Sequence, residues 1–216
     1  VTKLRRTNSG EKFAQIDGRF VCLLEYVEGK TPEGTVETYR KLGDIVALLH
    51  SITDYPHKTF FDPGVIIGSN FQENAKELSF GEEYLNIARM LPDFSQFSQT
   101  IIHTDIAPSN TVEQEDGNLV LIDWDDAGTG PTVLDLGYPL ISQFTTEEFE
   151  LRKDLAQAFY GAYFSKRQIT LEEKRVLFDA SLFFALMYLV YGNVEKRWKR
   201  LKWALDNRQA IEALIP

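Results

Sequence analysis

The segment "HTDIAPSN", residues 103–110, places a histidine, an aspartate and an asparagine directly after the apolar pair Ile101-Ile102. An aspartate at such a site can accept the proton of a hydroxyl group, and an asparagine oxygen is a hard ligand that suits Mg²⁺. Moving a phosphoryl group from ATP to a hydroxyl needs both functions. We therefore take Asp105 as a candidate base and Asn110 as a candidate metal ligand, against the plain alternative of an ordinary polar loop.

A second carboxylate follows a short distance along the chain. Asp123 comes directly after the apolar run 119–122, and the Asp116-Gly117 pair before that run is a turn signal. A strand–turn–strand return would bring Asp123 back beside Asn110, which makes it the second candidate ligand for Mg²⁺. Asp125 and Asp126 are equally well explained as binders of a cationic substrate or as solvated residues, with Asp126 the better candidate of the two.

These two motifs resemble those of the protein-kinase-like superfamily, and more closely its aminoglycoside phosphotransferase, choline kinase and homoserine kinase-like branch. Protein kinases carry H-R-D-x-x-x-x-N followed by D-F-G, and the motif at 103–110 keeps the same offsets. The resemblance implies that Asp105 is the catalytic base, that Asn110 and Asp123 bind Mg²⁺, and that His103 is structural. It also implies ATP as co-substrate.

Further segments extend the resemblance to residues 19–140. Asp135, in "TVLDLG", resembles the buried aspartate that braces the catalytic loop. "LLEYVEG" resembles the hinge between two lobes, where the carbonyl of Glu25 and the N–H of Val27 would meet adenine, with Tyr26 between them. Two positions depart from the branch: Thr104 stands where a glycine is more usual, and Ala107 replaces a frequent His or Lys.

The elements that must position these residues suggest an α+β, protein-kinase-like fold. Residues 1–29 form a remnant of the N-terminal β-sheet lobe and the hinge, and 30–216 form a mostly helical C-terminal lobe. The Asp17-Gly18 pair predicts a hairpin. Residues 57–71 are expected to be loop, with helix in the second half of 74–91. Further helices are predicted at 36–52, 96–102, 146–165, 170–191 and 195–213.

Composition limits the class of protein. The chain has 216 residues, 23 Lys plus Arg and 32 Asp plus Glu, for a net charge of −9. This balance argues against nucleic acid as a partner and mildly favours a cationic substrate. The longest uncharged apolar run is too short for a membrane span. The single cysteine, Cys22, and an N-terminus without a visible signal peptide favour the cytoplasm. Three histidines, His50, His57 and His103, make a zinc site improbable. His50 ends an apolar helix face and is interpreted as structural.

The basic segment 195–203 is interpreted as a solvated helix face beside a packed stripe, in preference to a phosphate-binding patch. The aromatic side chains Phe183, Phe184, Tyr188 and Tyr191 are interpreted as core, although one of them could line a substrate pocket.

The expected function is ATP-dependent phosphorylation of a small-molecule hydroxyl: an aminoglycoside, amino alcohol or homoserine-like acceptor. The alternatives are a non-catalytic kinase-like protein that binds a nucleotide or a partner, a metal-dependent hydrolase, or an inactive truncated fragment. In the resembling family a small lobe with a Gly-rich loop and a phosphate-binding Lys precedes the hinge. Only 24 residues precede Glu25 here, and neither Lys3 nor Lys12 suits that role. We therefore expect weak ATP binding, and either a homodimer through the exposed strands or completion by a further segment.

Overall fold

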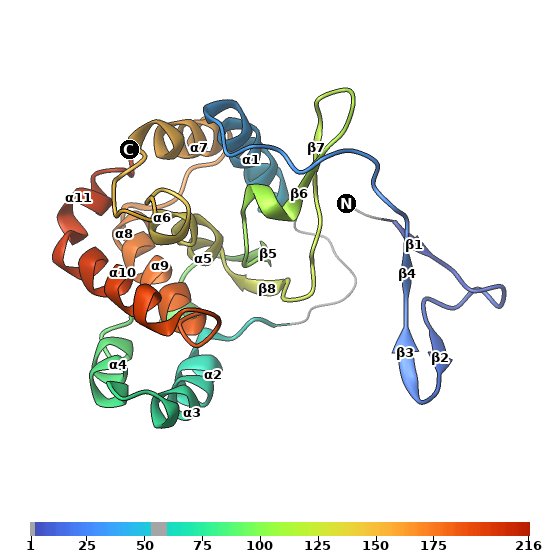
Figure 1. The fold of residues 1–216 in the computed structure, drawn as a ribbon. Helices are drawn as coiled ribbons and strands as arrows, with labels where there is room; N and C mark the ends of the chain where they lie inside the picture. Colours follow the sequence, from blue (N-terminus) through green and yellow to red (C-terminus); the bar gives the residue numbers. More distant parts are fainter. Residues whose placement is uncertain (1–2, 53–59) are drawn as a thin grey trace.

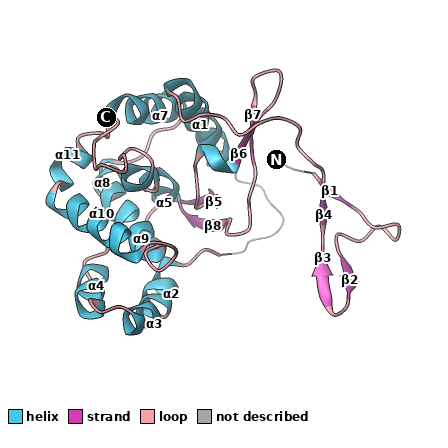
Figure 2. Cartoon of the chain, viewed as in Figure 1, coloured by secondary structure: helices cyan, strands magenta, loops and turns pink. Residues whose placement is uncertain are grey.

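The computed structural model describes residues 3–52 and 60–216, which form a helical body and a strand-rich N-terminal extension (Figure 1, Figure 2). The architecture is α+β, as the sequence predicts. His57 lies outside the described residues. Among the described helices, none combines the length and the apolar character that crossing a membrane requires.

The N-terminal extension consists of two small antiparallel strand pairs. β1 (Leu4–Arg5) pairs with β4 (Leu23–Leu24), and β2 (Ala14–Ile16) pairs with β3 (Arg19–Val21). The predicted hairpin is confirmed: Asp17 and Gly18 both have positive φ, 49° and 75°, as a tight two-residue turn between twisted strands requires. Large apolar side chains on these strands are exposed, including Phe20 at 71%. A homodimer through this region stays a prediction.

A long helix pair forms one side of the body. α1 (Val36–Leu49) begins at Thr35, whose hydroxyl accepts the backbone N–H of Thr38 at 3.2 Å. It packs against α7 (Lys153–Lys166) so closely that a Cβ at Gly43 would clash with the carbonyl oxygen of Phe159. This close packing places the C-terminal end of α1 in the interior of the protein.

Two further antiparallel pairs carry the motif loops. β5 (Gln99–Ile102) pairs with β8 (Gly128–Pro131), and β6 (Thr111–Glu113) pairs with β7 (Leu119–Leu121). The prediction of a helix at 96–102 is wrong. Thr100 and Ile102 are buried at alternate positions of a strand, which a helix would not place on one face.

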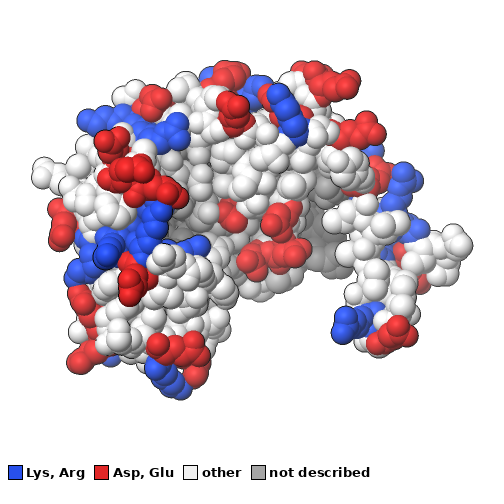
Figure 3. All heavy atoms as spheres, in the orientation of Figure 1, with Lys and Arg blue, Asp and Glu red and all other residues white. Residues whose placement is uncertain are grey.

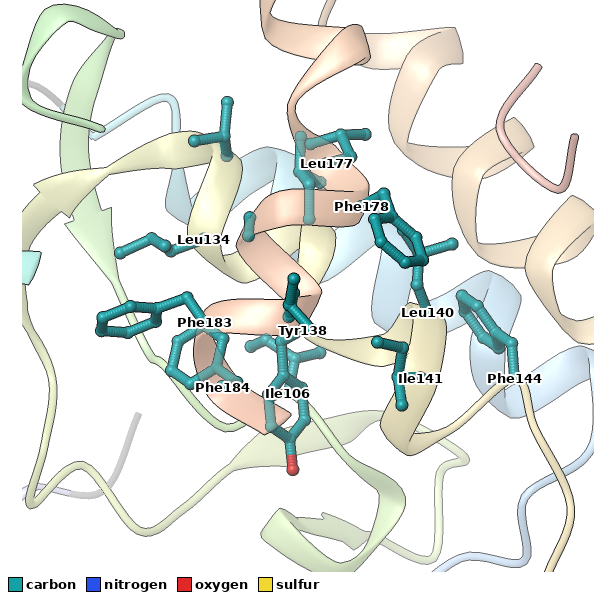
Figure 4. Close-up of a cluster of buried hydrophobic side chains, with 14 of the residues drawn as sticks. Ile106, Leu134, Tyr138, Leu140, Ile141, Phe144, Leu177, Phe178, Phe183 and Phe184 are labelled. Carbon is teal, nitrogen blue, oxygen red and sulfur yellow. The ribbon is translucent and has the colours of Figure 1, made fainter. Parts of the chain in front are cut away.

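An apolar helix fills the core. α9 (Leu177–Met187) packs against α5 (Thr132–Gly137) and α6 (Pro139–Ser142), and Figure 4 shows side chains of these three helices, among them Phe183 and Leu134, in one cluster. The remaining helices are α2 (Pro63–Gly68), α3 (Asn70–Glu77), α4 (Gly81–Ala88), α8 (Leu171–Arg175), α10 (Val194–Asp206) and α11 (Arg208–Glu212).

Several predicted helix boundaries are wrong for local reasons. The helix expected at 146–165 begins only at Lys153, because the hydroxyl of Thr146 accepts the backbone N–H groups of Glu148 and Glu150 and Phe149 adopts a φ of 67°. The helix expected at 170–191 is interrupted at Val176 and ends at Met187.

The helix expected at 195–213 breaks at Asn207, whose side-chain amide donates to the carbonyl of Trp203. Helix also occurs where loop was expected: α2 begins after Asp62, whose carboxylate accepts the N–H groups of Gly64 and Val65. The first half of 74–91 is likewise partly helical, as the end of α3.

Candidate active site

The motif loop at 103–110 leaves the end of β5 and closes in a short 3₁₀ turn at Pro108–Asn110. It places Asp105 half-buried between the fully buried Thr104 and Ile106. Thr104 has a φ of 73°, which is unusual for a β-branched residue. Backbone strain of this kind persists only where surrounding contacts hold it in place.

Asp135, on α5, supplies those contacts. Its side chain is fully buried, at 0% exposure. One carboxylate oxygen accepts the backbone N–H of His103 at 2.8 Å and the other accepts that of Thr104 at 2.7 Å. This is the geometry that the sequence predicts for Asp135, and it fixes the two residues that precede Asp105.

His50 joins the same network from the end of α1. Its Nε2 lies 3.1 Å from the Asp135 carboxylate and its Nδ1 lies 3.0 Å from the hydroxyl of Tyr163, on α7. All three side chains are buried. The sequence identified His50 only as structural. Its place at the end of an amphipathic helix gave no sign that it contacts the aspartate behind the motif loop.

His103 ties the loop to the segment that carries Asp123. Its Nε2 donates to the carbonyl of Ile122 at 2.9 Å, and its ring packs edge-on against Trp124 at 4.7 Å between centroids. Within the described part of the chain its buried Nδ1 has no hydrogen-bond partner. The contacts of His103 are thus those of a residue that joins two loops, as expected for a structural histidine.

A backbone hydrogen bond joins Asn110 to the residue before Asp123. The N–H of Ile122 donates to the carbonyl of Asn110 at 3.0 Å, so Asp123 follows directly after the contact. The side-chain amide of Asn110 donates to the carbonyl of Asp105 at 3.0 Å, which leaves its oxygen available as a ligand. Asp123 is exposed, has a φ of 61°, and has no hydrogen-bond or ion-pair partner within residues 3–52 and 60–216.

This donor set fits Mg²⁺. Magnesium is typically held by one or two protein oxygens, with phosphate oxygens and water completing an octahedron. Across the described residues there is no cluster of three or more His, Cys, Asp or Glu side chains that could hold a metal by itself. Asn110 and Asp123 would therefore need a phosphate group to complete the coordination of the ion.

Asp105 opens onto a cavity of about 550 Å³. Burial raises the pKa of Tyr138, and the nearby Asp105 carboxylate raises it further. Figure 4 shows the hydroxyl of Tyr138 at the edge of the apolar cluster. The lining also includes Tyr188, whose pKa is raised by burial and then by the carboxylates of Asp105, Asp126 and Asp123. Asp125 and Asp126 are both exposed and lie outside the lining of the cavity, so a role for either in substrate binding stays a prediction.

The hinge candidates lie apart from this cavity, at the end of β4 (Figure 1). The N–H of Glu25 donates to the carbonyl of Lys3 at 2.8 Å, and Tyr26 is 86% exposed. For the described chain, no backbone partner is found for the carbonyl of Glu25 or the N–H of Val27. Both groups are therefore available to a ligand, but the structure does not bring them into contact with the loop of Asp105.

The basic side chains on one wall of the cavity were not predicted from the sequence. Lys196, Arg197 and Arg200, on α10, line it together with Asn193. Lys196 and Arg197 are exposed, as the interpretation of 195–203 as a solvated face predicts, whereas Arg200 is half-buried. Their spacing of three and four residues was the available signal, because it places them on one side of a helix.

The residues that line the cavity come from α6, α9, α10 and the loops beside these helices. They are Asp105, Tyr138, Ile141, Ser142, Glu147, Ser181, Phe184, Ala185, Tyr188, Tyr191, Asn193, Lys196, Arg197, Arg200 and Leu201. Aromatic and basic residues thus share its surface with a single acidic residue besides Asp105, which is Glu147.

The chain is similar in sequence to characterised kinases. The chain is 27% identical to a 4-hydroxytryptamine kinase of Psilocybe cubensis, with 83% of this chain and 58% of that protein covered. It is 24% identical to the homoserine kinase of Zymomonas mobilis, with 81% and 58% covered. The chain therefore spans 58% of the length of these two curated relatives.

Solved structures show the same protein-kinase-like fold. A microcompartment-associated aminopropanol kinase superposes with a TM-score of 0.69 at 16% identity, with 99% of this chain and 77% of that chain covered. An aminoglycoside phosphotransferase from Alicyclobacillus acidocaldarius superposes with a TM-score of 0.64 at 18% identity, with 98% and 75% covered. Residues 6–169 match the phosphotransferase enzyme family, and the chain belongs to this family.

Proposed function

We propose that this protein transfers the γ-phosphoryl group of ATP to a hydroxyl group of a small molecule. The observation that carries the proposal is the position of Asp105 on the wall of a cavity of about 550 Å³, beside a loop junction that joins Asn110 to Asp123. A cavity of this size accommodates a small acceptor. Family membership supports the reaction class, and the named relatives are kinases of small molecules.

Each site residue then has a role that its contacts allow. Asp105 orients the acceptor hydroxyl and takes up its proton. Asn110 and Asp123 would hold Mg²⁺, which would supply positive charge to neutralise the transferred group. His103 and Asp135 keep the loop in the conformation that presents Asp105. The carbonyl of Glu25 and the N–H of Val27, on either side of Tyr26, are proposed to meet adenine.

The test is ATP consumption by the 216-residue chain, with Mg²⁺, against a panel of hydroxylated small molecules. With an acceptor that is phosphorylated, Asp105→Asn should lower kcat by about 10²–10⁴-fold, since the amide cannot accept the proton. The control is Asp206→Asn, which removes the same charge from an exposed position outside the cavity lining. Near-normal turnover by Asp105→Asn would show that Asp105 is not the base.

The second candidate function is nucleotide binding without catalysis, which would need only the Glu25 carbonyl and the Val27 N–H that are available to a ligand, together with a metal at Asn110 and Asp123. Mg²⁺-dependent ATP binding by the chain, with no turnover of any acceptor, would support this function over the first. Such a result would leave the roles of Asn110 and Asp123 intact and remove that of Asp105.

A further inference from the structure

The wall of the cavity contributed by α10 is basic. Three of the charged lining residues are cationic, Lys196, Arg197 and Arg200, and two are acidic, Asp105 and Glu147. Lys196 forms an ion pair of 2.7 Å with Glu147. Figure 3 shows basic side chains gathered over α10 and acidic side chains beside β8, with a largely uncharged surface between them. The α10 wall thus combines three basic side chains with Glu147, and Asp105 is the other acidic residue of the lining.

The two arginines make no direct ion pair with any described residue. Among the residues that the structure describes, neither guanidinium lies within ion-pair distance of a carboxylate. Arg200 is half-buried and donates one bond of 3.1 Å to the carbonyl of Thr146, while Arg197 donates to the carbonyl of Tyr188. A guanidinium carries five N–H donors, so each has several left for a ligand.

Burial makes the positive charge of Arg200 costly. It lowers the pKa of Arg200 from its ordinary value, the nearby Glu147 and Glu148 oppose that effect, and Arg197 adds to it. A cation in such a position gains more from a bound anion than a fully solvated one does, because less of its interaction is screened by water. Arginine also matches a carboxylate or phosphate in a fork of two parallel hydrogen bonds.

The start of α10 acts in the same direction. This 13-residue helix begins beside the cavity, where the Asn193 side chain accepts the N–H of Lys196 at 2.9 Å. The first turn of a helix carries a partial positive charge, which adds to that of Lys196 and Arg197. Glu195 lies in the same turn, but it is exposed and outside the cavity lining.

Aromatic side chains form a further part of the cavity lining. Tyr138, Phe184 and Tyr188 line the cavity, and Tyr138 and Tyr188 are the two residues whose pKa values respond to Asp105. An acceptor whose hydroxyl reaches Asp105 would therefore lie along an aromatic surface, with its far end toward α10.

We propose that the acceptor carries an anionic group, such as a carboxylate, at the end remote from its reacting hydroxyl, and that Arg197 and Arg200 bind this group. The acceptor class is thus a hydroxylated acid, and this inference rests on the proposed function of the same cavity. The net charge of −9 mildly favours a cationic substrate, but it averages over the whole surface and does not describe this wall.

The test uses acceptors that differ only in the remote group. Hydroxylated carboxylic acids of three to eight carbons, aliphatic and aromatic, are each paired with their neutral amide and with the corresponding amine. Binding to the 216-residue chain is measured at low salt by calorimetry or ligand-detected NMR, without ATP. The same triplets are then assayed for ATP-dependent phosphorylation. The binding readout does not require turnover, so it tests the anion site separately from the reaction.

The acid of at least one triplet should bind about 10-fold or more tightly than its amide and its amine, since charge-assisted hydrogen bonds from a guanidinium to a carboxylate contribute at this level. Arg200→Gln should reduce that preference to about 2-fold or less, and Arg197→Gln, at a more exposed position, should weaken it without endangering the fold. Lys199→Gln is the matched control, because it removes a positive charge from the same helix outside the cavity lining. Thermal unfolding confirms that each variant is folded.

Acids that bind no more tightly than their amides, or a preference that survives in both arginine variants, would overturn the inference. Phosphorylation of amines or neutral alcohols in preference to acids would also overturn it while leaving the proposed function intact. Arginine-dependent binding of acids without phosphorylation of any compound would support the anion site and count against the proposed function instead.

Discussion

The carboxylate of Asp135 accepts the backbone N–H of Thr104 at 2.7 Å, and Thr104 is thereby held at a φ of 73° directly before Asp105. The second oxygen of the same carboxylate accepts the N–H of His103. One buried side chain therefore sets the backbone conformation from which the proposed base projects. The strained residue, Thr104, and the residue that supports it, Asp135, are about 30 residues apart in the sequence, and the position of α5 brings them into contact.

Asp135→Asn should lower the free energy of unfolding by about 2–3 kcal/mol, because one of two charge-assisted acceptors becomes an amide donor that faces a backbone N–H. Turnover should fall with it, since the loop loses its support. Urea denaturation measures the first effect. Asp206→Asn, an exposed control on α10, should change stability by less than about 0.5 kcal/mol. A similar small change for Asp135→Asn would mean that the bonds from His103 and Thr104 contribute little.

Thr104→Gly should stabilise the protein by about 0.5–1 kcal/mol. A left-handed conformation costs a β-branched residue roughly 1–2 kcal/mol, which exceeds the added entropy of glycine in the unfolded chain. The change also removes a buried hydroxyl that has no hydrogen-bond partner in the described part of the chain. The midpoint of thermal unfolding should rise, whereas Thr31→Gly, at a residue without positive φ, should leave it unchanged or lower it. A lower midpoint for Thr104→Gly would show that packing of the threonine outweighs its strain.

Asp123→Asn should raise the Mg²⁺ concentration needed for half-maximal ATP binding or turnover by about 10-fold or more, because a neutral oxygen replaces an anionic ligand. Asp125→Asn removes the same charge two residues away, at an exposed position outside the cavity lining, and serves as the control. A Mg²⁺ titration of both variants separates coordination from general charge: equal shifts in the two would argue against Asp123 as a ligand.

The parts of the site that follow one another in sequence were predictable. Asp105 and Asn110 share one loop. The Asp116-Gly117 pair predicts a turn after which the chain runs back toward Asn110, and the residue before Asp123 contacts Asn110. Asp135 was predictable as a buried group because apolar residues flank it and a buried carboxylate needs partners. The hairpin at Asp17-Gly18 followed from turn chemistry in the same way.

Contacts between distant segments were not predictable from one sequence. Nothing near His50 indicates that its ring meets Asp135, because that contact depends on how α1 packs against α7. Arg197 and Arg200 have the pattern of a solvated helix face, and only the position of α10 turns them toward the cavity. The strand at 99–102 was missed because its partner, 128–131, lies beyond two intervening strands.

Glu173 supplies a prediction about pH. It is 4% exposed and forms a reciprocal cap at the start of α8: its carboxylate accepts the N–H of Thr170 at 2.8 Å, and the Thr170 hydroxyl accepts the N–H of Glu173 at 3.1 Å. The N–H of Ser98 also donates to the carboxylate, at 3.2 Å. Burial raises the pKa of Glu173, but the hydrogen bonds from Ser98 and Thr170 outweigh it, so the pKa lies below its ordinary value.

A carboxyl group whose pKa is lowered on folding stabilises the protein above its unfolded pKa, about 4.3 for glutamate, and loses that contribution as the pH falls through the folded value. Glu173→Gln should therefore lower the free energy of unfolding by about 1–2 kcal/mol near neutral pH, the usual effect of a weakened cap. The deficit should shrink as the pH falls below about 4.3. Urea denaturation across this range, with Glu172→Gln as an exposed neighbouring control, measures both effects. A deficit that stays constant with pH would assign the contribution of Glu173 to packing and neutral hydrogen bonding, and not to its charge.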